Sequence, residues 1–355
     1  MNDQADNKVP QPSQNPEHIG DEAHLGDEAS KGMIMFSNKG MPLEPLTFWK
    51  ALAWCVAAGA CAGFSPIVAP LFTGFGYAVL VGLDGLRKRA ICAASLIVPA
   101  ALCALIFRAA ALEDAVFSCV VGMVGSHLYL RNKLTPGIAC ICVAAMGLFL
   151  LAASEISARM AGTTLAALAG EVMDGYQQAL GSASIETRMV FDQLRTVFDA
   201  VWPTAFFIIA FAEFLLSLGG AFIGARRQRI DLGKRLPFQH FDLPLWVVGL
   251  LIAGILLLAL SKAVPAFGAT ALLVGGTLLG TLRLAFATQG CAVLSWFEHK
   301  RGWRGFIGLA ITAVVLYLEL NMFALTIVGV LDVWVNLRRL DRGVRVTVQD
   351  PTDKS

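Results

Sequence analysis

Five charged or amide side chains in the apolar stretches of this chain stand out: Glu213, Arg283, Glu319, Asn321 and Asp332. A polar group surrounded by apolar residues is costly unless it has a partner or a function. Glu213 is the most central, and it is either a ligand-contacting or proton-carrying acid or a structural carboxyl that is paired or protonated. Arg283 needs an acidic partner, and we predict an ion pair with Glu213 or Asp332. The alternative role for Arg283 is to anchor an anionic ligand.

The three C-terminal candidates have local interpretations as well. Glu319 and Asn321 occur where the last apolar stretch changes direction, which predicts an outer turn or, alternatively, a gate or the rim of a ligand site. Asp332 lies about two helical turns before a basic cluster. We therefore expect Arg338 to reach back along the helix and pair with Asp332.

Other kinds of chemistry have no support in the sequence. The eight cysteines all lie in apolar runs without a CxxC pair, which predicts small buried side chains, no disulfide framework and no metal site. Phosphate-binding, zinc-hydrolase, serine-nucleophile and dinucleotide motifs are missing, so we expect neither an enzyme nor a cofactor. The net charge of +2 does not suggest a nucleic-acid partner.

The composition requires a lipid environment for the elements that position these residues. Of the 355 residues, 56% are hydrophobic and 15% charged, whereas soluble domains have about 25% charged residues. We predict an all-α fold, a polytopic bundle of about eight to ten transmembrane helices. The first two runs and the last two are short, and each pair is either two spans or one kinked or re-entrant unit. The apolar runs lie at about 47–63, 66–83, 90–107, 114–130, 136–156, 201–224, 244–262, 267–297, 305–320 and 321–336.

The distribution of basic residues predicts the orientation. With ten spans, 22 of the 28 lysines and arginines fall on one side, together with both chain termini. Because basic loops stay in the cytoplasm, this pattern favours cytoplasmic N- and C-termini and a bacterial inner-membrane location. The bilayer is then the expected surrounding, and other membrane proteins are possible partners.

The remaining segments are polar. Residues 1–45 predict a disordered cytoplasmic tail, 46–340 the transmembrane domain and 341–355 a short cytoplasmic tail. Within 157–200, apolar residues at helical spacing alternate with acidic ones, which predicts two amphipathic helices on the outer surface. This loop packs on the bundle, forms a lid or gate, or docks a partner.

Several short motifs in the second half of the chain resemble a known family. The pattern Phe-x-Leu-Pro-x-Trp covers residues 241–246, Gln289-Gly290 ends a long apolar run, and Gly-x-x-Asp covers 329–332. These motifs are similar to the YybS-like family of predicted bacterial membrane proteins, a domain of unknown function. That family is distantly similar to the substrate-binding subunits of energy-coupling-factor vitamin transporters. The resemblance implies a multi-span inner-membrane bundle and supplies no activity.

Two functions remain open from the sequence. The first is a small-molecule binding or transport subunit with a polar site in the bundle, formed from the five side chains above and Gln289. The second is a structural or scaffold membrane protein that acts through protein partners. Neither the ligand nor the oligomeric state follows from the sequence.

Overall fold

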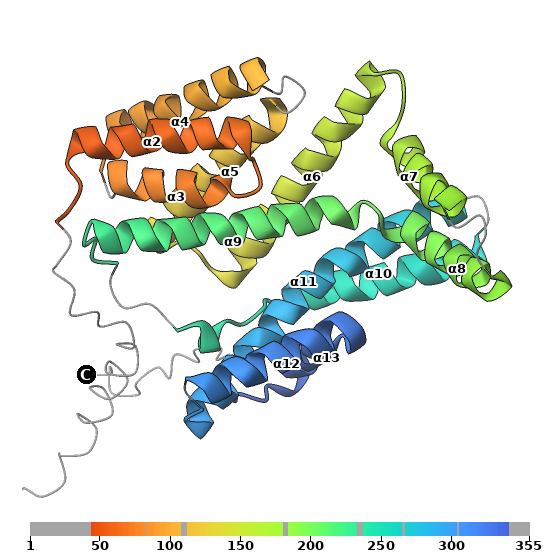
Figure 1. The fold of residues 1–355 in the computed structure, drawn as a ribbon. Coiled ribbons are helices and arrows are strands. Elements are labelled where there is room, and N and C mark those ends of the chain that lie inside the picture. Colours follow the sequence, from red (N-terminus) through yellow and green to blue (C-terminus); the bar gives the residue numbers. More distant parts are fainter. Residues whose placement is uncertain are drawn as a thin grey trace, which may run out of the picture. The chain divides into compact units, whose positions relative to one another are not determined.

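The protein is described here by a computed structural model, in which residues 44–82, 84–107, 112–179, 184–232, 237–264, 267–303 and 305–340 are placed. These residues form twelve α-helices and one short 3₁₀ helix, and no β-strand occurs among them (Figure 1). The predicted tails, 1–45 and 341–355, lie almost wholly outside the described residues. The all-α fold class is confirmed.

Each predicted apolar run is a helix. The helices are α2 Phe48–Phe64, α3 Ala69–Leu80, α4 Leu86–Phe107, α5 Leu112–Leu130, α6 Pro136–Met160, α7 Leu165–Ala179, α8 Ile185–Val201, α9 Thr204–Arg227, η2 Phe238–His240, α10 Trp246–Ala263, α11 Gly268–Arg301, α12 Phe306–Met322 and α13 Ala324–Val335.

Fewer helices than expected are long and apolar enough to cross a membrane. In the described residues, α4, α6, α9, α10 and α11 meet this condition alone. The pair α12 and α13, bent by 94° at Phe323, adds a sixth span if it counts as one broken unit. The prediction of eight to ten spans is therefore too high by length and composition. Helices α2 and α3 have only 17 and 12 residues, and α5 has Glu113 and Asp114 in its first turn.

Local sequence explains several helix boundaries. Thr135 caps α6, where its side chain accepts a hydrogen bond from the Ile138 N–H and Pro136 occupies the first helical position. Helix α11 ends at Gly302, which adopts the left-handed conformation that glycine accepts without strain. Between α2 and α3 the chain leaves helical geometry at residues 65–68, where Pro66 falls, as expected for a break near a proline.

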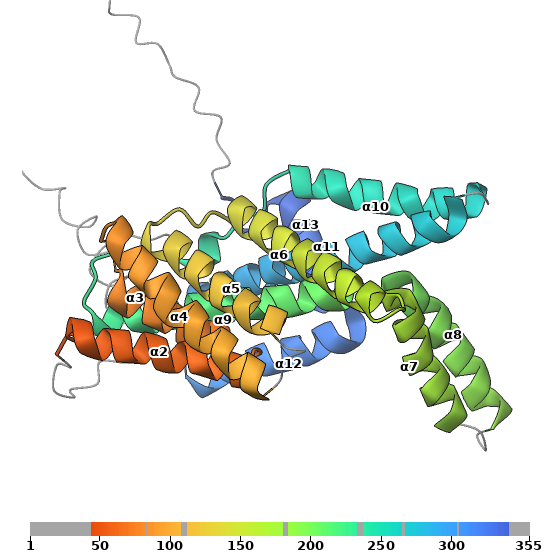
Figure 2. The ribbon, with the colours of Figure 1, turned by 90° about the horizontal axis from the view of Figure 1, so that it is seen from above.

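Two groups of helices pack closely. Helices α2, α3, α4, α5 and α9 form the first, with α9 lying along α3 and α5 (Figures 1 and 2). Gly220 and Gly224 allow this approach: a Cβ on Gly220 would lie 2.0 Å from the Leu71 carbonyl oxygen. The small-residue spacing in the sequence therefore marks helix contacts within the chain.

The second group contains α10, α11, α13 and η2, and α11 also contacts α9. Helix α6 packs against α9, and the contact between α9 and α11 links the two groups. The segment 157–200 contains α7 and α8, as the amphipathic pattern predicts. The two helices lie side by side (Figure 2), and an ion pair of 2.8 Å between Arg195 and Asp174 joins them.

All eight cysteines are free, and none forms a disulfide. Cys55, Cys92 and Cys119 are fully buried, as expected for small apolar side chains. The prediction that all eight are buried is wrong, because Cys61 is exposed on the outside of α2 and the remaining four are partly exposed. A side chain on the outer face of a membrane bundle meets lipid, which tolerates a thiol as readily as a packed core does.

Candidate functional site: an apolar pocket and its polar clamp

A pocket of about 630 Å³ lies among α6, α9, α10 and α11. It runs along α6 from Leu134 to Leu151 and along α11 from Leu273 to Thr288. At 1.5 Å per residue these stretches are about 22–25 Å long, most of the roughly 30 Å of a bilayer's hydrocarbon core. The segment between α9 and α10 closes one end, where Phe238, Phe241 and Trp246 line the pocket.

The chemistry of this pocket is apolar. Among the described residues, no charged side chain lines it, and its polar members are chiefly threonines. Thr281 and Thr288 donate their hydroxyl hydrogens to the carbonyls of Thr277 and Leu284, both at 2.8 Å. These back-bonds satisfy the hydroxyls on the helix itself. The pocket therefore suits a hydrocarbon chain and offers no fixed charge to orient a small polar molecule.

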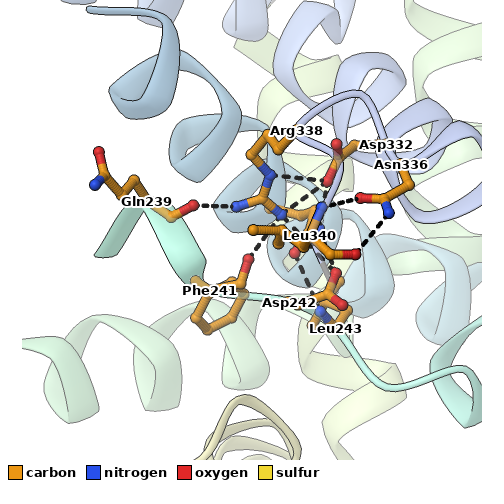
Figure 3. A network of polar contacts seen from close by, with 9 residues as sticks. Gln239, Phe241, Asp242, Leu243, Asp332, Asn336, Arg338 and Leu340 are labelled. Atoms are coloured by element: carbon orange, nitrogen blue, oxygen red, sulfur yellow. Dashed lines mark hydrogen bonds and ion pairs between the residues drawn. The ribbon is translucent and has the colours of Figure 1, made fainter. Parts of the chain in front are cut away.

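A polar clamp holds the segment that closes the pocket (Figure 3). Arg338, just after α13, donates to the carbonyl oxygens of Gln239 at 2.6 Å and Phe241 at 2.8 Å. The same guanidinium pairs with Asp332 at 2.8 Å, and both side chains are fully buried. The predicted pair of Asp332 and Arg338 is thus confirmed. Through its hydrogen bonds to the carbonyls of Gln239 and Phe241, Arg338 holds the backbone that carries the pocket residues Phe238 and Phe241.

Gln289 is the second element of this clamp. Its amide nitrogen donates to Asp332 at 2.7 Å and to Asp242 at 3.1 Å, and its oxygen accepts from the Leu243 N–H at 3.1 Å. The amide therefore joins α11, α13 and the segment before α10. Gln289 is fully buried, so water cannot reach its amide. The three hydrogen bonds within the protein satisfy the amide instead.

Two glycines let α11 and α13 come close enough for this contact. A Cβ on Gly329 would lie 1.9 Å from the Phe286 carbonyl oxygen, and one on Gly290 would lie 2.1 Å from that of Leu325. Real Cβ atoms do not approach backbone this closely, so any side chain here would push the helices apart. In the Gly-x-x-Asp motif, Gly329 thus allows α13 to approach α11 closely, and this approach brings Asp332 within hydrogen-bond distance of Gln289.

Arg283 lies elsewhere, and its predicted pairing is wrong. It does not pair with Glu213, which faces Ser118 on α5. It does not pair with Asp332 either, because Asp332 lies at the level of Gln289, six residues or about 9 Å farther along α11. Arg283 instead contacts Glu319, with Nε 3.2 Å from Oε1, and donates to the Glu319 carbonyl oxygen at 3.0 Å. Its guanidinium also stacks 4.1 Å from the ring centroid of Phe323.

Glu319 stabilises the bend between α12 and α13. Its carboxylate accepts hydrogen bonds from the N–H and the hydroxyl of Thr326, at 3.0 and 2.7 Å, in the first turn of α13. An acidic group at a helix N-terminus accepts hydrogen bonds from free N–H groups and interacts favourably with the positive end of the helix dipole. The prediction of a turn at this position agrees with the bend at Phe323. Asn321 bonds the Tyr317 carbonyl on its own helix at 2.8 Å and is exposed.

Glu213 lies apart from both the clamp and the bend between α12 and α13. It is buried on α9 and faces α5, where the Ser118 hydroxyl oxygen lies 3.4 Å from its Oε1. Its Oε2 has no hydrogen-bond partner among the described residues. The six predicted residues therefore do not converge on one polar site. They divide into a clamp (Gln289 and Asp332), a bend (Arg283 and Glu319), the isolated Glu213, and the outward Asn321.

The sequence missed the pocket itself. Its lining residues are ordinary apolar side chains of spans, which look the same whether they face lipid, another helix or a cavity. The signal that did exist was the Phe-x-Leu-Pro-x-Trp motif, whose Phe241 and Trp246 line the pocket. An aromatic motif interrupting two spans would have marked this segment.

Helices of this length and hydropathy, packed through glycines and joined by buried ion pairs, define a polytopic α-helical membrane protein. The chain belongs to the family described as predicted membrane protein (DUF2232), whose family model matches residues 60–333. No curated protein and no solved structure matches the chain. The similarity to energy-coupling-factor subunits stays a prediction.

Proposed function

We propose that this protein binds a lipid-like amphiphile, with its hydrocarbon chain in the pocket among α6, α9, α10 and α11. The observation that carries the proposal is a cavity of about 630 Å³ lined by apolar side chains from four candidate spans. Burying a chain there removes about 0.8 kcal/mol of unfavourable hydration per methylene if the molecule arrives from water. This role is a form of the small-molecule binding or transport subunit that the sequence suggests.

The closed end of the pocket supports an amphiphile. Helix α6 starts there just after Arg131 and Lys133. Helix α9 ends in Arg226 and Arg227, eight residues beyond Leu218, its last pocket residue. Basic residues at the ends of spans favour anionic headgroups and, by the positive-inside rule, the cytoplasmic face of a bacterial inner membrane. On this proposal the start of α6 and the end of α9 lie on the cytoplasmic side, and the headgroup lies beside η2. Both termini share that side if α5 also crosses the membrane and the α12–α13 pair returns to the side that it left.

The test uses a lipid with a photoactivatable group on its acyl chain, incorporated into vesicles with the purified full-length protein. After illumination, mass spectrometry locates the labelled peptides. We expect labelling of α9 and α11 at pocket residues such as Phe211 and Leu282, in excess of labelling on outward-facing residues of α4. Two matched variants test the pocket. Ala144 lines the pocket, so Ala144→Phe fills it, whereas the neighbouring Ala145 is exposed and does not line the pocket, so Ala145→Phe is the control.

Ala144→Phe should abolish pocket labelling, while Ala145→Phe should leave it unchanged. Equal labelling of both variants would refute the proposal. If a membrane protein co-purifies and protects the pocket from the probe, the scaffold function is favoured instead.

A further inference from the structure

The carboxyl of Glu213 is the most unusual buried group outside the pocket and its clamp. Its neighbour Phe214 lines the pocket, whereas Glu213 turns to α5 and to the break between α2 and α3. Only 5% of Glu213 is exposed. No lysine or arginine among the described residues contacts it, and Oε2 has no partner there. An unpaired carboxylate in such a place would be strongly unfavourable.

The hydroxyl of Ser118 decides which form of Glu213 fits. A serine hydroxyl has one hydrogen to donate and can also accept. The Ser118 oxygen lies 2.9 Å from the Pro66 carbonyl oxygen and 3.4 Å from Glu213 Oε1. Because a carbonyl can only accept, the shorter contact takes the single hydrogen. Glu213 then completes the chain only by donating a hydrogen of its own to Ser118.

We propose that Glu213 is a proton-binding site that links α9, through Ser118 on α5, to the Pro66 carbonyl at the break between α2 and α3. With the proton bound, the three groups form one chain: Glu213 donates to Ser118, and Ser118 donates to Pro66. When the proton passes to water, the new carboxylate competes with Pro66 for the Ser118 hydrogen. The contact that holds the break against α5 is then weakened.

The surroundings of Glu213 favour a proton over a metal cation. The oxygens of Glu213, Ser118 and Pro66 are the set that the structure places together, fewer than the six or more of a typical hard-cation site. The acidic residue of α5 closest to Ser118 is Asp114, four residues earlier in the same helix. An acid gives Glu213 no cationic counter-ion.

The experiment is infrared spectroscopy of the full chain in lipid nanodiscs, with the glutamate carboxyl carbons labelled with ¹³C. We expect a band from a protonated carboxyl at neutral pH that Glu213→Gln removes. Glu155→Gln is the matched control, since Glu155 accepts from Arg159 at 2.7 Å and is expected to be ionised. Ser118→Ala should keep the band and move it to higher wavenumber, because the carboxyl loses its acceptor.

Thermal unfolding gives a second readout. A proton held in the folded protein and released at neutral pH on unfolding stabilises less as pH rises. The wild type should therefore lose more stability than Glu213→Gln, whose amide cannot ionise, as the pH rises from about 5, just above the pKa of an unfolded glutamate, toward alkaline pH. Absence of the band in the wild type, or its survival in Glu213→Gln, refutes the proposal. The spectra are recorded with choline as the buffer cation and again with sodium. Loss of the wild-type band in sodium would show a sodium site and would also refute the proposal. If Glu213→Gln does not fold, the Ser118→Ala shift still decides.

Discussion

Replacing Arg338 with methionine tests whether the polar clamp fixes the end of the pocket. Methionine keeps much of the length and the apolar stem of arginine but removes every donor. The carboxylate of Asp332 would then remain fully buried with Gln289 and without its 2.8 Å cationic partner. The carbonyl oxygens of Gln239 and Phe241 would lose their hydrogen bonds as well.

The expected loss follows from the burial of this pair. Removing one partner of a buried ion pair costs about 3–5 kcal/mol, because the other charge stays buried without compensation. We expect Arg338→Met to lower the free energy of unfolding by an amount in this range. Combining it with Asp332→Leu should cost less than the sum of the two single changes, by about 0.5–3 kcal/mol, because the uncompensated charge is gone.

The assay is reversible unfolding in mixed micelles, followed by circular dichroism. Arg339→Met is the matched control: Arg339 is the next residue and is exposed, so its loss should stay within about 0.5 kcal/mol. The photoactivatable lipid adds a functional readout, since a loosened 238–243 segment should reduce labelling at Phe241. Equal, small losses for both arginine variants would show that the clamp does not stabilise the fold.

Two further predictions follow from packing and from topology. Gly329→Ala should destabilise the protein by about 1–3 kcal/mol, because its Cβ would meet the Phe286 carbonyl oxygen at 1.9 Å, whereas Gly249→Ala has open space and should be tolerated. Unfolding of the two variants in parallel checks this, and equal stability would contradict the close contact of α11 and α13. Reporter fusions at residues 230 and 302 should both report the cytoplasm, because basic clusters surround both positions. Opposite locations would refute the proposed orientation.

Some polar contacts could be predicted from sequence because they are local. Asp332 and Arg338 are six residues apart at the end of one helix, so a long side chain reaches back to the acid. The turn near Glu319 was likewise visible as an interruption in an apolar stretch. The partner of Arg283 was not predictable, because the sequence offers Glu213 and Asp332 as acidic partners and indicates only a turn at Glu319.

The pocket shows the opposite case. Phe211, Leu282 and Ala144 are typical span residues, and nothing in their type separates a cavity wall from a lipid-facing surface. Which side of α6, α9 or α11 faces the cavity depends on how these helices rotate and cross. That rotation is set by close contacts such as Gly220 against Leu71 and Gly329 against Phe286.

Hydropathy and chain breaks act locally along the chain, so the membrane environment, the helical class and the positions of the helices could all be predicted from the sequence. The separation of the six polar residues into different places and the apolar character of the cavity emerge only from the packed helices. A buried charge is neutralised by whichever partner helix packing brings within hydrogen-bond distance. Packing depends on how well the surfaces of helices far apart in the chain fit together. The spacing of residues along one helix carries no information about that fit.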